Sequence, residues 1–431
     1  MDVSSRGMNR TSGGNAGRRW TLPIVQNGRR LELECLETLD ELLVLKEEWQ
    51  ALERRTPEPF TYFQSFDWCI SWCRAFLDGE AAADQRPSVY VLWDGGECLM
   101  IWPLMTRRVA GTVRAVVPLS APMNQYAALL YDPARFDLTL GKRVFDGICG
   151  RGEGDAICLD HVPQTALLAR IIGGRGVSPL TEQQSSILDL TDIADWESHH
   201  RALPKKQRLQ RNSRRNRLEK LGRLDYRVLT PADAEYADQV DRCIAMKQDW
   251  LKGTGRLGRD LFDPRFAAFL RGLGQGAGPD EGCVYLHALT LDGVPIAMEL
   301  GMRFRKDYYC FLGAIDLAYQ QYSPGKVQME SAQRWAIESG IHRFDFLNDP
   351  SAYKSSWTNT SEPLTALYVP LTALGQVYCR QWMAGLRPRL RALYHGLGPA
   401  WRGRFRHVLD RLQALVGRAG GSMSLVLYCM P

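Results

Sequence analysis

The stretch 320–357, QQYSPGKVQMESAQRWAIESGIHRFDFLNDPSAYKSSW, places a Ser-Pro-Gly turn directly between an apolar strand pattern and a helix pattern. The first N–H groups of a helix have no partner within the helix, and the helix dipole adds partial positive charge there. A phosphate group fits such a corner. Pro324 suits the first helical position, Gly325 allows close backbone approach, and Ser323 suits the N-cap. The stretch predicts either an anion-binding corner or simply a well-capped helix.

The segments around this stretch predict an α+β unit. Residues 282–304 read as two strands around Asp292-Gly293, a pair that favours the tight turn of a β-hairpin. Residues 307–316 are apolar on both faces, which favours the centre of a sheet. Periodicity and breakers predict the remaining elements: helices over 203–222, 231–251 and 263–273, and strands over 224–229 and 342–347.

The first half of the chain repeats this order. A hairpin is predicted around Asp94-Gly95, followed by strand and loop over 114–133. A helix over 137–148 and a buried strand over 155–163 come next, and two helices over 35–55 and 65–76 precede the hairpin. We therefore predict an α+β fold of two tandem units, with mixed, mainly antiparallel sheets flanked by helices.

The composition sets the ranges that we expect for these units. The first thirty residues are polar and rich in Gly, Ser, Asn and Arg, which is typical of a disordered tail. After Pro370 the chain becomes basic and amphipathic. We expect a disordered tail over 1–30, a first unit over 31–185, a second unit over 186–371 and a basic helical extension over 372–431, with helices over 375–397 and 400–417.

Bulk composition excludes several classes of protein. The chain has 431 residues, of which 45% are hydrophobic and 24% charged, as in a water-soluble globular protein. No apolar run is long enough to span a membrane. The eleven cysteines are scattered, so we expect free thiols in the cytoplasm. Cys69 and Cys73 lack the partners of a zinc site, and we expect no metal. The absence of a Gly-x-Ser-x-Gly motif argues against a serine hydrolase.

The net charge of +6 is concentrated in two segments. Residues 201–223 hold ten Lys or Arg against one acid, hence +9, and residues 380–418 hold nine Arg against one acid, hence +8. The basic helix over 203–222 suits nucleic acid, an anionic membrane, an acidic substrate or merely a solvated face. No known nucleic-acid motif accompanies it. The C-terminal pair of helices suits either an anionic membrane or the protein's own body.

Four stretches carry a resemblance to a known family: LDGVPIAMEL, YSPGKVQMESAQRWAIESG, HRFDFLNDPSAYKSSW and the basic LPKKQRLQRNSRRNRLEKLG. On these stretches the chain resembles the GNAT acyltransferase superfamily and, within it, the CelD-like group associated with bacterial cellulose and exopolysaccharide synthesis. The resemblance covers residues 31–370 and is strongest over 203–357. Two tandem GNAT-like units also resemble the architecture of FemAB-type peptidyltransferases.

The resemblance implies an acyl donor, acetyl-CoA. In GNAT proteins the turn before this helix holds the donor's pyrophosphate, usually in the motif Q/R-x-x-G-x-G/A. This chain keeps Gln321 and Gly325 but has only one Gly. No equivalent turn and helix follows 114–122, so we expect the first unit to lack a cofactor site. The cofactor-binding residues implied for the second unit are Gly313, Ala314, Gln321, Ser323, Gly325 and Lys326.

Acyl transfer from a thioester to an amine requires an oxyanion donor, a base and an acid. The resemblance makes 307–316 and 342–347 a splayed pair of strands, with Gly313 and Ala314 as backbone donors. Each of three candidates also has a non-catalytic alternative: Glu299 would face solvent, Asp345 would pair with Lys354 or Arg343, and Tyr353 would only pack against its neighbours. The expected catalytic residues are the bases Glu299, Asp316 and Asp345 and the acid Tyr353, and the expected substrate-binding residues are Lys205, Arg208, Lys354 and Trp357.

The activity that the resemblance implies is that of a GNAT-type N-acetyltransferase. It would move acetyl, or another acyl group, from acyl-CoA to an amine or hydroxyl of a small molecule or polysaccharide-pathway intermediate. One alternative is a FemAB-type aminoacyl transferase that uses charged tRNA, the only nucleic acid expected as a partner. Another is a non-catalytic accessory protein of a polysaccharide synthase. The protein is expected in the cytoplasm, peripheral to the inner membrane through its C-terminal helices.

Overall fold

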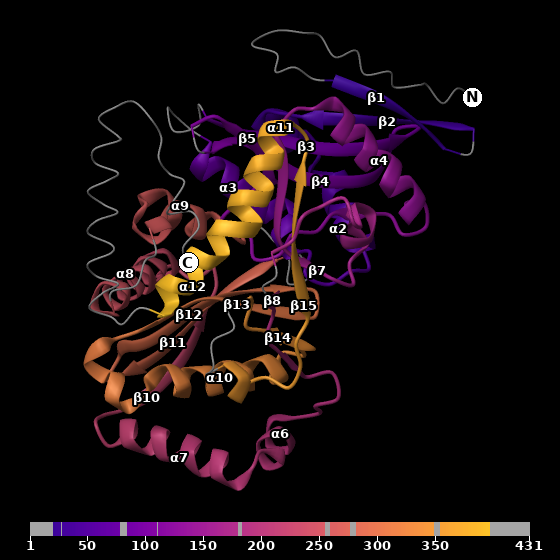
Figure 1. The fold of residues 1–431 in the computed structure, drawn as a ribbon. Coiled ribbons are helices and arrows are strands. Elements are labelled where there is room, and N and C mark those ends of the chain that lie inside the picture. The colour runs from indigo at the N-terminus through magenta and orange to yellow at the C-terminus, as the bar shows by residue number, and fades with distance from the viewer. Residues whose placement is uncertain are drawn as a thin grey trace, which may run out of the picture.

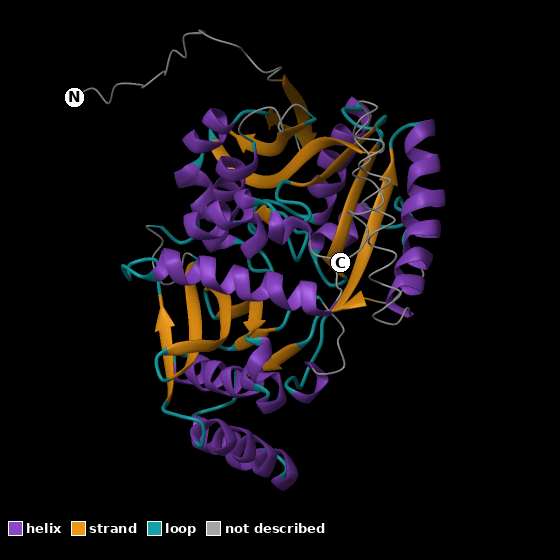
Figure 2. Cartoon of the chain, turned by 90° about the vertical axis from the view of Figure 1, so that its left-hand side faces the viewer, coloured by secondary structure: helices purple, strands orange, loops and turns teal. Residues whose placement is uncertain are grey.

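The computed structural model describes residues 20–26, 28–77, 84–109, 111–179, 183–254, 259–275, 282–348 and 354–396. They form two sheets, drawn one above the other in Figures 1 and 2, with helices on the faces of both. Tyr353 and the second helix expected in the C-terminal extension lie outside the described residues.

The first sheet has the strand order β1-β2-β3-β4-β5-β7-β15-β8, with β6 beside β4. The neighbours are antiparallel except β5 and β7, which are parallel. Helices α1 to α3 cover one face, and α4 and α5 cover the other. The strands are β1 (Trp20–Gln26), β2 (Arg29–Leu36), β3 (Gln85–Asp94), β4 (Glu97–Val109), β5 (Val113–Pro118), β6 (Leu130–Tyr131), β7 (Ala156–Pro163), β8 (Gln183–Gln184) and β15 (Pro363–Pro370); the helices are α1 (Leu39–Val44), α2 (Lys46–Arg55), α3 (Phe66–Phe76), α4 (Leu138–Arg151) and α5 (Leu167–Ile172).

The second sheet has the order β10-β11-β12-β13-β14-β9, in which β13 and β14 are parallel. Helices α8 and α9 cover one face, α10 covers the other, and α7 lies outside α10, at the bottom of Figure 1. The strands are β9 (Ile187–Asp189), β10 (Leu224–Leu229), β11 (Cys283–Leu291), β12 (Val294–Phe304), β13 (Asp307–Ile315) and β14 (Arg343–Asp345); the helices are α6 (Trp196–Ala202), α7 (Lys205–Glu219), α8 (Tyr236–Thr254), α9 (Pro264–Gly272) and α10 (Pro324–Glu338).

The two halves share one order of elements. Each has a hairpin, a third antiparallel strand, a helix and a strand parallel to the third: β3-β4-β5-α4-β7 in the first half and β11-β12-β13-α10-β14 in the second. A parallel neighbour needs a crossover connection, and a helix supplies it here. The predicted α+β fold with two mixed, mostly antiparallel sheets is confirmed.

Strands β1 and β15 differ from the unit boundaries that the sequence predicted. Strand β1 falls within the range expected to be a disordered tail; it forms because Trp20 and Ile24 bury their side chains in the first core while the backbone pairs with β2. Strand β15 falls within the range expected for the second unit, yet it pairs with β7 and β8 in the first sheet. The second sheet is therefore inserted between two adjacent strands of the first.

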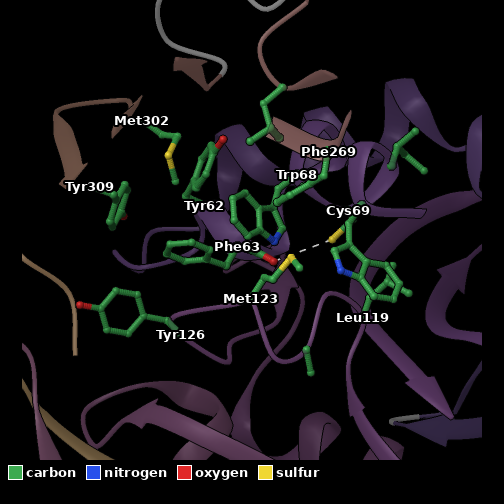
Figure 3. Close-up of a cluster of buried hydrophobic side chains, with 14 of the residues drawn as sticks. Tyr62, Phe63, Trp68, Cys69, Leu119, Met123, Tyr126, Phe269, Met302 and Tyr309 are labelled. Carbon is green, nitrogen blue, oxygen red and sulfur yellow. Dashed lines mark hydrogen bonds between the residues drawn. The ribbon is translucent and has the colours of Figure 1, made fainter. Parts of the chain in front are cut away.

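A single hydrophobic core joins the two halves. Figure 3 shows Tyr62 and Trp68 from the first half packed toward Phe269 and Tyr309 from the second. The ring centroids of Tyr62 and Tyr309 lie 5.8 Å apart, and those of Trp68 and Phe269 lie 4.8 Å apart. Large aromatic side chains dominate the energy of packed cores. The shared core therefore holds the two sheets in a fixed relation.

The C-terminal helix expected over 375–397 is present and packs on the first sheet. It comprises α11 (Ala373–Val377), a π-helical stretch η6 (Tyr378–Leu386) and α12 (Arg387–Gly396), shown in yellow in Figure 1. Arg387 binds Asp160 of β7, with 3.2 Å between Nη1 and Oδ2. In the described part of the chain, no helix is long and apolar enough to cross a bilayer.

Candidate active site

The site begins where two parallel strands separate. Strands β13 and β14 pair only from Asp307 to Tyr309 on β13, and β14 ends at Asp345 while β13 continues to Ile315. Leu347 has a φ of 63°, a turn in the backbone that carries the chain away from β13. A cavity of about 550 Å³ lies in the opening. Its walls are Cys310, Phe311 and Gly313 to Ile315 of β13, the segment 346–348, Met298 and Glu299 of β12, and the first turns of α10.

The N-terminus of α10 forms one wall of this cavity. Pro324 is the first helical residue, and Ser323 occupies the N-cap position with φ 57° and ψ 51°. The Ser323 side chain makes no capping hydrogen bond; the Ser323 carbonyl instead accepts from the Lys326 amide at 3.0 Å. A Cβ at position 325 would lie 2.9 Å from Ile315 Cγ2, so Gly325 lets the helix start close against β13. The corner opens on the cavity.

Most residues predicted to bind the cofactor line the cavity. Lys326 has its pKa lowered by burial and by the positive charge of Arg214 on α7, so two cations lie near the helix terminus. Gln321 is the exception: it is exposed on the 3₁₀ helix Leu317–Tyr322, and its neighbour Gln320 lines the cavity instead. That short helix turns the side chain at 321 away from the cavity, which the sequence did not indicate. The predicted cofactor-binding residues that line the cavity are Gly313, Ala314, Ser323, Gly325 and Lys326.

Glu299 is buried and lines the cavity, so the solvent-facing alternative is wrong. It lies opposite Gly313 in the register of β12 and β13. Its carboxylate accepts hydrogen bonds from Tyr308 Oη at 3.0 Å and from Gln328 Nε2 at 3.1 Å. Burial raises the pKa of the Glu299 carboxyl above its usual range, and the two hydrogen bonds act in the opposite direction. A raised pKa suits a base that works near neutral pH.

Asp345 is buried but does not line the cavity. Its two oxygens accept from Tyr126 Oη at 2.9 and 2.8 Å, and one also accepts from the Leu347 amide at 2.7 Å. Burial raises the pKa of Asp345 to about 7. Its hydrogen bonds thus come from Tyr126 of the first half and from the Leu347 amide. Arg343, named in our alternative, lies near enough for its charge to act against the raised pKa of Asp345, but its Nε donates to Asp307 Oδ1 at 2.8 Å.

Asp316 also lies apart from the cavity, although the sequence made it a candidate base. Its side chain caps the 3₁₀ helix Leu317–Tyr322 by accepting from the Ala318 amide at 2.9 Å. Of the predicted bases, only Glu299 lines the cavity. Tyr353, the predicted acid, falls outside the described residues.

Comparison with known families finds a likeness for the segment that forms most of this cavity. Residues 205–355 match the family model described as acetyltransferase (GNAT) domain. This segment, about a third of the chain, is similar to GNAT domains and includes most of the cavity walls. No curated protein matches the chain.

Comparison with solved structures concerns the fold alone. The chain is similar to FemX, with a TM-score of 0.54 and 12% identity over 77% of this chain and 97% of that one. It also matches a tandem GNAT protein from the clavulanic acid biosynthesis pathway, with a TM-score of 0.43 and 10% identity over 79% and 99%. The C-terminal domain (DUF2156) of a putative lysylphosphatidylglycerol synthetase from Agrobacterium fabrum matches with a TM-score of 0.49 and 13% identity over 81% and 99%.

Two of the four predicted substrate-binding residues, Lys354 and Trp357, line the cavity. Lys354 is buried and donates from Nζ to the Phe346 carbonyl at 2.5 Å. Trp357 lines the cavity and carries the Arg211 guanidinium 4.2 Å from its ring centroid. Lys205 and Arg208 do not reach the cavity, and Lys205 lines a separate groove on the outer face of α7. Helix α7 turns a different face to α10, and a run of basic residues does not reveal which face packs.

Several residues that line the cavity escaped the sequence analysis. Lys247 and Trp250 reach the cavity from α8, and Gln125 reaches it from the first half of the chain. Asn348 fixes this junction, because its Nδ2 donates to the Gln125 carbonyl at 2.9 Å. These positions are far apart in sequence and belong to no motif, so only the folded chain could reveal them.

Proposed function

We propose that this protein transfers an acyl group, preferentially acetyl, from acyl-CoA to an amine or hydroxyl acceptor. One observation carries the proposal: the cavity lies in the opening between β13 and β14, and the N-terminus of α10 forms one of its walls. An anionic carrier entering that opening would meet the positive end of the α10 dipole together with the Lys326 side chain. The donor site is assigned to the second half, because residues 119–137 separate β5 from α4 in the first.

The reaction requires donors for the developing oxyanion. Beyond Tyr309, β13 has no pairing with β14, so backbone groups on that side of Cys310 to Ile315 are open to a ligand. Amide donors of this kind stabilise charge where it forms. We assign this role to the strand around Gly313 and Ala314.

Glu299 is the proposed general base. The acceptor nitrogen or oxygen attacks the thioester carbonyl, and its proton passes to the Glu299 carboxylate, directly or through a water molecule. The C–S bond then breaks as the carbonyl re-forms, and the CoA thiolate leaves and takes up a proton. Tyr353 remains the proposed donor of that proton. Asp316 and Asp345 are instead proposed to have structural roles, because each is held by hydrogen bonds away from the cavity.

The acceptor is proposed to be a sugar derivative from a polysaccharide pathway, as the CelD-like resemblance implies. The acceptor side of the cavity holds Trp250 and the amide side chains of Gln125 and Asn348. An aromatic face and neutral amide groups suit the apolar and hydroxyl surfaces of a sugar. The cysteines that the structure describes are free thiols, which fits a cytoplasmic enzyme that draws on acyl-CoA.

The deciding experiment is calorimetric titration of the purified chain with acetyl-CoA. We expect saturable one-site binding that weakens about tenfold or more in Lys326→Ala, because a hydrogen bond to a charged group contributes about 1.5–3 kcal/mol. Lys205→Ala is the matched control, since Lys205 lies on α7 outside the cavity. Absence of binding to acetyl-CoA and to longer acyl-CoA would refute the proposal.

The FemAB-type resemblance makes aminoacyl-tRNA the rival donor to test in parallel, and the fold match to FemX keeps this rival open. If the rival holds, charged tRNA binds with an affinity that falls steeply with salt, and acetyl-CoA does not bind. If neither donor binds, a non-catalytic accessory role replaces both.

A further inference from the structure

We propose that the outward face of the C-terminal helix, residues 373–396, binds the surface of a membrane that contains acidic phospholipids. The proposal concerns a different surface from the acyl-transfer cavity and does not depend on that activity.

The inner face of this helix fixes which side chains point outward. Gly375, Cys379 and Met383 follow one another at a spacing of four residues and are buried. A Cβ at position 375 would lie 1.7 Å from the Asp155 carbonyl oxygen, so the helix backbone lies directly against the start of β7. Arg387 holds the next turn through Asp160. The opposite face is therefore held toward solvent.

That outward face carries large apolar side chains. Leu374, Val377, Leu386 and Leu393 are 44%, 60%, 46% and 68% exposed. They are four of the ten exposed large hydrophobic residues in the described part of the chain, and each of the other six lies on a different element or loop. Concentrated apolar surface of this kind marks an interaction site.

The same helix is basic and lacks acidic residues. Residues 373–396 contain four Arg and no Asp or Glu, and Arg380 and Arg389 are exposed beside the apolar side chains. The sequence continues in the same way, because residues 397–418 add five Arg against one Asp. Arginines next to exposed leucines match the boundary between anionic headgroups and acyl chains.

This combination favours a lipid surface over other occupants. Nucleic acid or an acidic protein would satisfy the arginines but leave the leucines in water. A second copy of the helix would bury the leucines but bring arginines against arginines, which is unfavourable. Helix α7 offers an internal comparison, since its outer groove is basic yet contains a single leucine, Leu209.

The test is co-sedimentation of the full chain with vesicles of phosphatidylcholine alone and of phosphatidylcholine mixed with phosphatidylglycerol. We expect sedimentation only with the mixed vesicles. The double variant Val377→Asp/Leu393→Asp should bind about tenfold or more weakly, because it removes two apolar groups from the contact. Arg380→Gln/Arg389→Gln should lose about fivefold per arginine. Leu209→Asp is the matched control, because it changes an equally exposed leucine on the other basic helix.

Three outcomes would overturn the proposal. The first is that the wild-type chain does not sediment with mixed vesicles. The second is that it sediments equally with neutral vesicles. The third is that Leu209→Asp abolishes sedimentation while Val377→Asp/Leu393→Asp does not. Light scattering of the same samples separates a further case: self-association that only Val377→Asp/Leu393→Asp removes, without vesicle binding, would assign the face to a second copy. Thermal unfolding of each variant checks that the fold is retained.

Discussion

At the scale of single residues, the carboxylate of Glu299 is the most informative group. It is buried beside the proposed acyl-transfer position, and Tyr308 and Gln328 donate to it. Gly301 makes this arrangement possible, because a Cβ there would lie 2.1 Å from the Tyr308 hydroxyl. A strand position without a side chain thus leaves room for the tyrosine that orients the proposed base.

Glu299→Gln should lower kcat by about 10²–10⁴-fold, because the amide cannot accept the acceptor's proton. It should leave the dissociation constant of acetyl-CoA nearly unchanged, since the variant keeps the size of the side chain. Steady-state kinetics and calorimetry on the same sample check both parts. Equal losses in kcat and in acetyl-CoA affinity would instead indicate a structural role.

Tyr308→Phe should shift the pH dependence of kcat. The wild-type rate should fall as pH drops and Glu299 becomes protonated. The Tyr308 hydroxyl donates to the charged form and so lowers the pKa of Glu299; without it the pKa rises, and the acidic limb moves to higher pH. Gln328→Leu should move the limb in the same direction, and an unmoved limb in both variants would exclude Glu299 as the titrating group.

At the scale of elements, local sequence signals predicted much of the second half of the chain. The Asp292-Gly293 pair gave the hairpin of β11 and β12, and the Ser-Pro-Gly turn gave the start of α10 at Pro324. These signals are local because turn and cap preferences depend on neighbouring residues. Two features depend on packing partners that lie far away in sequence, and the sequence analysis mispredicted both. It expected a disordered tail where β1 forms, and it expected Lys205 and Arg208 of α7 at the site, although a different face of α7 packs on α10.

The residues that line the cavity also divide into those that local sequence signals indicate and those that only the folded chain brings there. Glu299, Lys326 and Lys354 could be selected from motifs and neighbouring strands. Gln125 could not, because it reaches the cavity from a loop that precedes α10 by nearly half the chain.

Gly375→Ala tests the docking of the C-terminal helix. The new Cβ would clash with the Asp155 carbonyl, a backbone atom that cannot move alone, so we expect a loss of about 1–3 kcal/mol in the free energy of unfolding. Chemical denaturation measures it. Gly150→Ala in α4 is the control, because nothing lies within 4 Å of a Cβ at that position. A similar loss in both variants would mean that α-helical glycines matter here for another reason.

At the scale of the whole molecule, the contact between the two halves includes a titratable group. Asp345 of β14 meets Tyr126 of the first half within the shared core. The pKa of Asp345 rises from 3.8 to about 7 on folding, so between those pH values the folded state keeps a proton that the unfolded state releases. Stability from this group is therefore present at low pH and is lost as pH rises through 7.

Asp345→Asn should remove that dependence, because the amide can accept from Leu347 and donate to Tyr126 without ionising. Relative to the wild type, the variant should gain stability as pH rises from 5 to 8. Urea denaturation at both pH values measures the difference, and Asp67, whose pKa is also raised, cancels because it is common to both proteins. A constant difference between variant and wild type would contradict a raised pKa at Asp345.

The insertion of one sheet within another has a practical consequence for dissecting the chain. Pro363 is the register partner of Gln184, so the polypeptide leaves the upper layer and re-enters it at neighbouring points. If the chain were divided into an N-terminal and a C-terminal half, β15 would be separated from the first sheet. If residues 187–360 were excised and the flanks joined by a short linker, every strand pairing of the first sheet would be kept. The excised piece, whose own ends lie close together, is in turn suited to circular permutation.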